Sequence, residues 1–254
     1  MKNLLCLAAL LLPQLAGGTT PHLRVCSLTL APQTMKGEDG LPTGYAVEIL
    51  QHVAVNLGWQ IQIDYMPWAR VTSEMQLGRC DMAMTVLYFK DYAEYMRFPN
   101  EAILDQKNVL LVRRESKIRF DGDLETFMRS HSIGVYADKR VNEKFERLRA
   151  APWAKVDTVS SSDLNLKKLL AKRFDAVIEN DLSSIYELRK QGRLDEVDIL
   201  HPPLSVTPAY IVFSRAPESE NHMKQYDVEL ARFKKTPKFR ALTNKYLPES
   251  AGAQ

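Results

Sequence analysis

The sequence has few of the residue patterns that carry metal, nucleophilic or phosphate chemistry. Its five histidines are scattered, and no two stand at i and i+4, the spacing that places two metal ligands on one helix face. It contains no Gly-x-Ser-x-Gly turn, phosphate-binding loop or dinucleotide-binding glycine pattern. The sequence therefore indicates no metal site and no cofactor, and these absences favour a binding role over catalysis.

Cysteine is scarce as well, with three residues in 254. Only Cys26 and Cys80 lie beyond the N-terminal segment discussed next, and a pair in an exported protein favours a disulfide. Cys26 is the fourth residue of a strand expected from Leu23, whereas Cys80 precedes a strand expected from Asp81. If these strands are parallel neighbours, the offset is roughly three residues or about 10 Å, beyond the roughly 7 Å limit for bridging. We therefore expect two buried free thiols, with a disulfide as the alternative.

Only one apolar run is suited to a membrane, and it lies at the N-terminus. Met1 and Lys2 give a positive start, residues 4–12 are apolar but too short to span a bilayer, and residues 13–18 are small or polar. This pattern is typical of a cleaved secretory signal peptide over residues 1–18. We expect a soluble mature chain in the periplasm.

Neither charge sign is in large excess, since 34 Lys and Arg residues face 31 Asp and Glu residues. The lysine and arginine clusters fall on amphipathic helical stretches, where they form a solvated face, so the sequence does not indicate nucleic-acid binding. With 45% hydrophobic residues, the chain can bury one large core or two medium ones.

Short β-branched runs alternate with helical patterns along the chain, which is typical of parallel sheets with crossover helices. In the first unit we expect strands at 23–28, 60–65 and 81–87 and helices at 45–57 and 68–77. In a second unit, from about residue 116 to 204, we expect strands at 131–137, 156–159, 174–179 and 197–200, and helices at 141–148, 162–170 and 182–190. Ser162 is the expected N-cap of the middle helix of this unit.

The last part of the chain predicts how the two units are joined. Apolar runs at 108–112 and 210–214 flank the second unit as paired crossovers, and helices at 218–234 and 237–246 return to cover the first unit. The fold class is then α/β with two lobes, each a doubly wound mixed sheet flanked by helices, joined by a two-strand hinge. Lobe 1 comprises residues 19–112 and 210–254, and lobe 2 comprises residues 113–209.

Several short motifs occur in the order and spacing of a known family. They are Leu23-Arg24-Val25, Gly44-Tyr45-Ala46-Val47-Glu48, Leu77-Gly78-x-x-Asp81, the segment 93–99, Phe174-Asp175-Ala176-Val177-Ile178 and the terminal helix at 234–247. Together they resemble the family-3 extracellular solute-binding proteins, periplasmic receptors that deliver polar amino acids and related solutes to ABC importers. The resemblance implies a two-lobed periplasmic-binding-protein fold, a small-molecule solute, and an inner-membrane ABC permease or a sensor as partner of a monomeric chain.

The sequence departs from this family at its ligand-binding motifs. Tyr92 stands where family members carry the arginine that forks onto the ligand's α-carboxylate, and a tyrosine cannot supply that charge-assisted pair. Asn180 replaces the aspartate that takes the α-ammonium, with Asp181 one step later. Asp138-Lys139-Arg140 replaces a Gly-Ser/Thr turn whose amides hold an anion. These changes argue against an ordinary α-amino acid as ligand.

The candidate ligand-binding residues follow expected strand ends, where ligands collect in doubly wound folds. They are Trp68, Arg70, Thr85, Tyr88, Tyr92, Lys139, Arg140, Asn180 and Asp181. Each has an alternative role without ligand contact: Trp68 and the aromatic cluster can pack under a loop, and Arg70 can be exposed to solvent. Either Asn180 or Asp181 can cap the helix that follows, which leaves the other free to face the cleft.

The sequence thus predicts a periplasmic binding protein that captures a small polar or polar-aromatic solute between its lobes for ABC-type transport. One alternative is an enzyme on the same scaffold, similar to cyclohexadienyl dehydratases, with Glu179 as the acid. Without a catalytic role, Glu179 is expected to be a surface residue at a strand end. Another alternative is a soluble sensor subunit.

Overall fold

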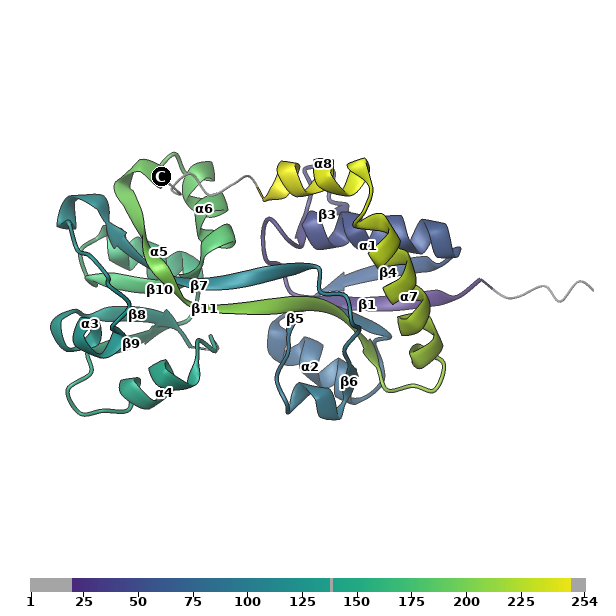
Figure 1. Cartoon of the computed structure of the whole chain (residues 1–254), viewed down its shortest axis with the longest axis horizontal. Helices are drawn as coiled ribbons and strands as arrows, with labels where there is room; N and C mark the ends of the chain where they lie inside the picture. Colours follow the sequence, from purple (N-terminus) through teal and green to yellow (C-terminus); the bar gives the residue numbers. More distant parts are fainter. Residues whose placement is uncertain (1–19, 138, 248–254) are drawn as a thin grey trace, which may run out of the picture.

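Two lobes lie side by side along the long axis of the molecule and are joined by two long strands, as the computed structural model shows for residues 20–137 and 139–247 (Figure 1). In these residues one curled mixed sheet runs through both lobes in the order β4-β1-β5-β11-β7-β10-β8-β9, and β6 pairs with β11. The two-lobed α/β fold expected from the sequence is confirmed. The expected signal peptide at 1–18 lies outside the described residues.

The first lobe contains the start of the sheet and four helices. Its strands are β1 (His22–Ser27), β4 (Gln60–Tyr65), β5 (Met82–Leu87) and β6 (Met96–Arg97), with a small ribbon of β2 (Met35–Lys36) and β3 (Pro42–Thr43). Its helices are α1 (Tyr45–Leu57), α2 (Trp68–Gln76), α7 (Ser219–Phe233) and α8 (Pro237–Tyr246), with a 3-10 turn η1 (Tyr92–Glu94). The apolar face of α1 is buried against both C-terminal helices, so distant parts of the sequence share one core.

The second lobe repeats the strand–helix alternation. Its own strands are β8 (Ile133–Tyr136), β9 (Val156–Val159) and β10 (Ala176–Asn180), and its helices are α3 (Leu124–Ser130), α4 (Glu143–Arg149), α5 (Ser162–Leu170) and α6 (Asp181–Lys190), with 3-10 turns η2 (Arg114–Ser116) and η3 (Leu194–Glu196). The sequence did not predict α3. Ser161, and not Ser162, caps α5, because its side chain accepts a hydrogen bond from the Leu164 amide.

The connecting strands are β7 (Leu104–Arg113) and β11 (Val197–Ser214), which pair antiparallel. The expected strand at 197–200 is therefore only the beginning of β11. The runs 108–112 and 210–214, expected as paired crossovers, lie on these two paired strands but not opposite each other: residues 108 and 110–112 pair with 205 and 198–200, and residues 210–213 pair with β5. Residues 109–112 pack in the second-lobe core. The expected boundaries at 112 and 210 stay a prediction, and we propose to place the crossing near Lys107 and its partner Val206.

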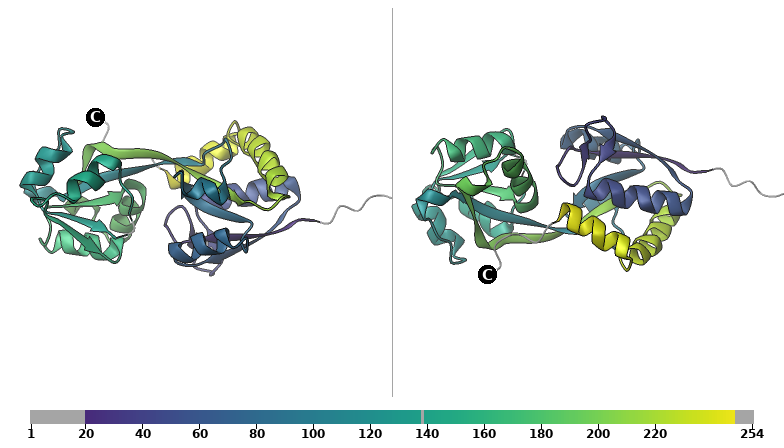
Figure 2. Two further views of the ribbon diagram at one scale, coloured as in Figure 1. Left: turned by 90° about the horizontal axis from the view of Figure 1, so that it is seen from below. Right: turned by 90° about the horizontal axis from the view of Figure 1, so that it is seen from above.

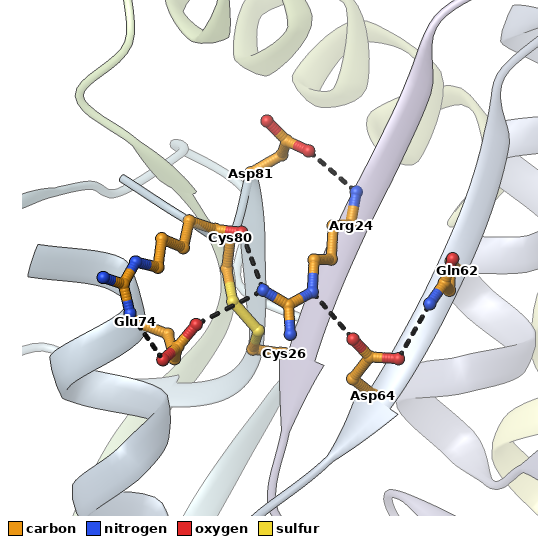
Figure 3. Close-up of a disulfide and its surroundings, with 8 residues drawn as sticks. Arg24, Cys26, Gln62, Asp64, Glu74, Cys80 and Asp81 are labelled. Carbon is orange, nitrogen blue, oxygen red and sulfur yellow. Dashed lines mark hydrogen bonds and ion pairs between the residues drawn. A yellow bond between two sulfur atoms is a disulfide. The ribbon is translucent and has the colours of Figure 1, made fainter. Parts of the chain in front are cut away.

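Cys26 and Cys80 form a disulfide in the first lobe, with their Cα atoms 6.0 Å apart, so the expectation of free thiols is wrong (Figure 3). The strands are parallel neighbours as assumed, and Cys26 lies opposite Ala83. The expected offset holds only for a chain that runs straight into β5. Instead the chain bends at Asp81, whose carboxylate accepts a hydrogen bond from the Arg24 amide at 2.7 Å, and this bend lets Cys80 reach the neighbouring strand.

An arginine beside the disulfide holds the same segment. The Arg24 guanidinium pairs with Asp64 at 2.7 Å and with Glu74 at 3.3 Å, and it donates to the Arg79 carbonyl at 3.1 Å (Figure 3). Its hydrogen bond also lowers the pKa of the Asp64 carboxyl. Three elements, β1, β4 and α2, are thereby tied at the start of β5.

No helix among residues 20–137 and 139–247 has the length and apolar character needed to cross a membrane.

Gly44 fixes where α1 begins and supports a first prediction. Its φ is 120°, and a Cβ there would lie 2.6 Å from the Gln33 carbonyl oxygen and 2.7 Å from that of Pro32. These carbonyls accept the first two amides of α1, so the loop cannot move away without uncapping the helix. We expect Gly44→Ala to lower the free energy of unfolding by about 2 kcal/mol in urea denaturation.

The matched control is Gly40→Ala. Gly40 also has a positive φ, 78°, but a Cβ there meets nothing within 4 Å. Equal losses in the two variants would show that backbone conformation alone, and not the close approach of the 32–33 carbonyls, makes Gly44 necessary.

Candidate functional site

The strand directions bring the carboxyl ends of both half-sheets to the space between the lobes. In the first lobe β5 is antiparallel to β11 and parallel to β1, and β1 is parallel to β4, so all three end toward the second lobe. In the second lobe β8 and β10 run parallel to each other, and β10 is antiparallel to β7, so both end toward the first lobe. Figure 2 shows β7 and β11 spanning this region. Residues that follow these strands are placed on facing edges.

On the first-lobe edge an aromatic group surrounds Tyr92. The Trp68 indole N–H donates to the Tyr92 hydroxyl at 3.0 Å, and the Tyr92 ring makes edge contacts with Trp68, Phe89 and Tyr95. Burial, with the nearby Tyr92 and Asp91, raises the pKa of Tyr95 to about 12. The structure therefore brings Trp68 and Tyr92 together, and both remain partly exposed at this edge.

Thr85, Tyr88 and Arg70 lie near this group in different settings. Thr85 is buried and has φ 58°, because β5 has one residue more than β11 between Ala83 and Val86. A positive φ is unusual for a β-branched residue. β-Bulges of this kind are frequent beside functional sites. Tyr88 is 53% exposed and stacks edge-on against Phe98. Arg70 is exposed, and no ion pair joins it to any other described residue.

The second-lobe edge contains a buried polar cluster. Glu179 is only 2% exposed, accepts a hydrogen bond from Asn165 at 2.7 Å and lies 3.7 Å from the Lys139 ammonium. Lys139 also donates to the Asn108 side chain at 3.4 Å. The expectation that Glu179 is a surface residue is therefore wrong, because the end of β10 is covered by α5 and by the segment after β8.

Of the two residues that the sequence offered as the cap of α6, the structure uses Asn180. Asn180 is the N-cap of α6, since its side-chain oxygen accepts from the Ser183 amide at 3.0 Å. Asp181 is the first residue of α6. Burial raises the pKa of the Asp181 carboxyl, while the Leu182 amide, Lys107 and His201 act in the opposite direction. Asp181 thus has no close counter-ion among the described residues.

Asp181 should destabilise the folded chain near neutral pH. In the folded state its carboxylate is partly desolvated, whereas in the unfolded state it is hydrated, so the charged form favours unfolding. We expect Asp181→Asn to raise the midpoint of thermal denaturation at pH 7. This gain should shrink as the pH falls through the raised pKa and vanish below 3.8, where the carboxyl is neutral in both states.

The matched control is Asp163→Asn, an exposed carboxylate in the first turn of α5. It should lower or leave unchanged the midpoint, because its charge is hydrated and favourable at a helix N-terminus. A pH-independent gain in Asp181→Asn would contradict the role of burial.

Side-chain hydrogen bonds cross between the lobes. Arg140, which follows β8, forms a two-bond pair with Asp91, which follows β5, at 3.1 and 2.8 Å. On α6, Tyr186 donates to the Met35 sulfur at 3.5 Å and Ser183 lies 3.4 Å from the Gln33 carboxamide. These contacts show that the two edges face each other directly.

Sequence reasoning missed Asp91, Asn108 and Asn165 at this site. Asn108 carried a usable signal, because it is a polar residue in an apolar strand run, and Asn165 lies on the buried face of α5. Asp91 gave no signal by itself. Two surface pockets, one around Asp157 and Arg173 and one around Glu38 and Pro42, involve none of the predicted residues. Within the described ranges no group of three or more His, Cys, Asp or Glu residues is arranged to hold a metal ion.

Comparison with known proteins identifies a protein family and a shared fold. The profile of the bacterial extracellular solute-binding proteins, family 3, matches residues 23–249. No curated protein matches the chain significantly. A histidine kinase sensor domain with similarity to periplasmic binding proteins superposes with a TM-score of 0.77 at 17% identity, covering 90% of this chain and 97% of the other.

Two further solved structures are ancestral binding proteins. An ancestral arginine-binding protein bound to arginine has a TM-score of 0.74 at 16% identity, covering 91% of this chain and 100% of the other. An ancestral amino-acid-binding protein, a precursor of cyclohexadienyl dehydratase, has a TM-score of 0.69 at 17% identity, covering 89% and 94%. At these identities the likeness establishes the fold.

Proposed function

Because the chain belongs to the bacterial extracellular solute-binding proteins of family 3, we propose that it captures a small polar or polar-aromatic solute between its lobes. The observation that carries the proposal is the convergence of strand ends from both lobes on one region. Residues on both edges can contact one small molecule there, and the two connecting strands provide the hinge about which the lobes close.

The first-lobe contacts supply ring surface and neutral hydrogen-bonding groups. Trp68, Tyr88 and Tyr92 offer contact area, while Thr85 and Arg70 orient polar groups of the solute. Tyr92 occupies the position of the family's carboxylate-binding arginine, and its hydroxyl already accepts the Trp68 N–H. A tyrosine so engaged offers no charge to a carboxylate, which argues against an ordinary α-amino acid.

The second-lobe contacts act in the same direction. Asn180 uses its side-chain oxygen to cap α6, and this neutral amide is a weaker partner for an ammonium group than a carboxylate is. Lys139, Arg140 and Asp181 remain as charged groups on this edge. The proposed solute is therefore not a zwitterion whose carboxylate and ammonium groups are each bound by an opposite charge.

We place the chain in the periplasm, exported through its N-terminal segment, where a closed, solute-bound form would be recognised by an ABC permease. A sensor is the other partner of this kind, and the likeness to a histidine kinase sensor domain supports considering it. Both partners would recognise the same change, namely closure of two lobes over the solute.

A second candidate is an enzyme that eliminates a hydroxyl from an aromatic precursor. It is favoured by the burial of Glu179 at the edge, with Lys139 and Asn165 in contact. A buried carboxyl beside a lysine is an arrangement that acid–base catalysts use. The likeness to a precursor of cyclohexadienyl dehydratase is one of fold and agrees with this candidate.

A thermal-shift screen with amino acids, polyamines, organic acids and aromatic acids tests both candidates. Each solute that raises the melting temperature is incubated with the protein, and the mixture is analysed for new products. A binder returns its solute unchanged with both wild type and Glu179→Gln. Product formation that Glu179→Gln abolishes would identify the enzyme instead, and tight binding of glutamine, histidine or arginine that Tyr92→Ala leaves unchanged would contradict the proposed ligand class.

A further inference from the structure

The single ion pair that joins the lobes within residues 20–137 and 139–247 lies among the site residues. Arg140 Nη1 and Nη2 donate to the two carboxylate oxygens of Asp91 at 3.1 and 2.8 Å. This parallel arrangement is the one in which a guanidinium recognises a planar carboxylate. Arg140 therefore holds a carboxylate in the interlobe region already, and that carboxylate belongs to the protein.

The guanidinium is oriented by aromatic rings of the opposite lobe. Its central carbon lies 4.5 Å from the centre of the Phe89 ring and 5.1 Å from that of Tyr92. Tyr92 is in turn held by the Trp68 indole. Contacts of this kind favour the cation over the ring face and fix the plane of its donors. The arginine missing from the first lobe at Tyr92 is thus supplied next to Tyr92 by the second lobe.

Both members of the pair remain accessible to solvent. The Arg140 side chain is 48% exposed and that of Asp91 is 53% exposed. Hydrogen bonding from Arg140 lowers the pKa of the Asp91 carboxyl, so Asp91 is charged at neutral pH. Exposed pairs contribute little to stability, and Asp91 stays hydrated when it is released. A carboxylate from solution can therefore exchange with Asp91 without leaving a buried charge unpaired.

We propose that Arg140 is the carboxylate-recognising residue of the interlobe site and that Asp91 is its built-in competitor, so that the solute is a monocarboxylate with a planar apolar group. The carboxylate of the solute replaces that of Asp91 on the guanidinium, and its apolar group contacts the rings of Phe89 and Tyr92. Asp91 then sets the affinity threshold, because every bound carboxylate must displace it. This inference rests on the proposed binding function and specifies the solute class.

The test uses calorimetric titration of the mature chain with benzoate, phenylacetate and cinnamate, each compared with its neutral amide. Asp91→Asn should bind at least one of these carboxylates about three- to fivefold more tightly than wild type, the gain expected from removing an exposed competing charge. The amides should be unaffected. Arg140→Gln should weaken carboxylate binding at least tenfold, and Arg140→Lys should restore only part of it because lysine lacks the two-donor fork.

Lys90→Gln is the matched control, because Lys90 precedes Asp91 and is an exposed cation of the same loop. It should change carboxylate affinity less than twofold. Equal affinities in Asp91→Asn and wild type, undiminished binding in Arg140→Gln, or no binding of any of the three carboxylates would overturn the inference. If another solute class nevertheless closes the lobes, the proposed function stands and only this inference falls.

Discussion

Replacing both Cys26 and Cys80 with alanine is expected to lower the free energy of unfolding by about 4 kcal/mol. The bond links residues 54 positions apart, and opening a loop of this length increases the conformational entropy of the unfolded chain by about this amount. Both cysteines are buried, at 0% and 1% exposure. Alanine side chains at these positions therefore gain no contact with solvent that would offset the loss of the bond. Urea denaturation of the oxidised wild type and of the double variant measures the difference.

Reductant separates the bond from the packing of the two side chains. In dithiothreitol the wild type should fall to near the stability of the double alanine variant, while the variant itself should not change. The disulfide account is contradicted if oxidised and reduced wild type unfold at the same urea concentration. Loss of the bond should also weaken solute binding, because β5 begins two residues after Cys80, contains Thr85 and ends just before Tyr88.

Lys139→Met is expected to lower the free energy of unfolding by about 3 kcal/mol, which is the second large effect. Glu179 is 2% exposed and the Lys139 side chain 13% exposed, so removing the ammonium leaves a carboxylate in the interior without its cation. Asn165 still donates one hydrogen bond to Glu179, but an amide offsets less of the burial than a charge does. Thermal and urea denaturation at pH 7 measure the loss.

The double variant Lys139→Met, Glu179→Gln tests the cause. Because glutamine removes the buried charge and keeps the shape, it should recover most of the stability lost in Lys139→Met. Lys90→Met serves as control, since Lys90 is exposed and has no carboxylate within 4 Å among the described residues. A double variant less stable than Lys139→Met alone would show that the two side chains do not act as a pair.

Most of the fold could be predicted because the local signals agree with the tertiary packing. The strand at 60–65 and the helix at 237–246 have the expected bounds, and Gly58 ends α1 in the left-handed conformation that glycine adopts readily. Errors arose where pairing partners lie far apart in sequence. Residues 108 and 110–112 lie opposite 205 and 198–200, and not opposite 210–214, and this register between β7 and β11 is not encoded by hydrophobicity alone.

The strand-end positions of the candidate residues were predictable, but their contacts were not. Strand ends located Trp68, Thr85, Lys139 and Glu179 on facing edges, because the carboxyl edge of a parallel sheet follows from strand direction. The partners of those residues did not follow. Whether Glu179 is buried depends on the path of α5, and the pairing of Arg140 with Asp91 depends on the distance between the lobes.

The bend at Asp81 illustrates the same limit at shorter range. The strand offset that argued against a disulfide holds only for a straight chain. At the bend the Asp81 carboxylate accepts a hydrogen bond from the Arg24 backbone amide, and this donor lies 57 positions away in the sequence. The expectation for Cys26 and Cys80 was wrong because the chain bends just before β5.

The most direct test of the central claim is small-angle X-ray scattering of the mature chain with and without a solute that raises its melting temperature. If the two lobes close over a solute held between them, the radius of gyration falls at saturating solute, and Arg140→Gln reduces both the fall and the affinity when the solute is a carboxylate. A solute that binds tightly while the radius of gyration stays the same, in wild type and variant alike, would contradict the account.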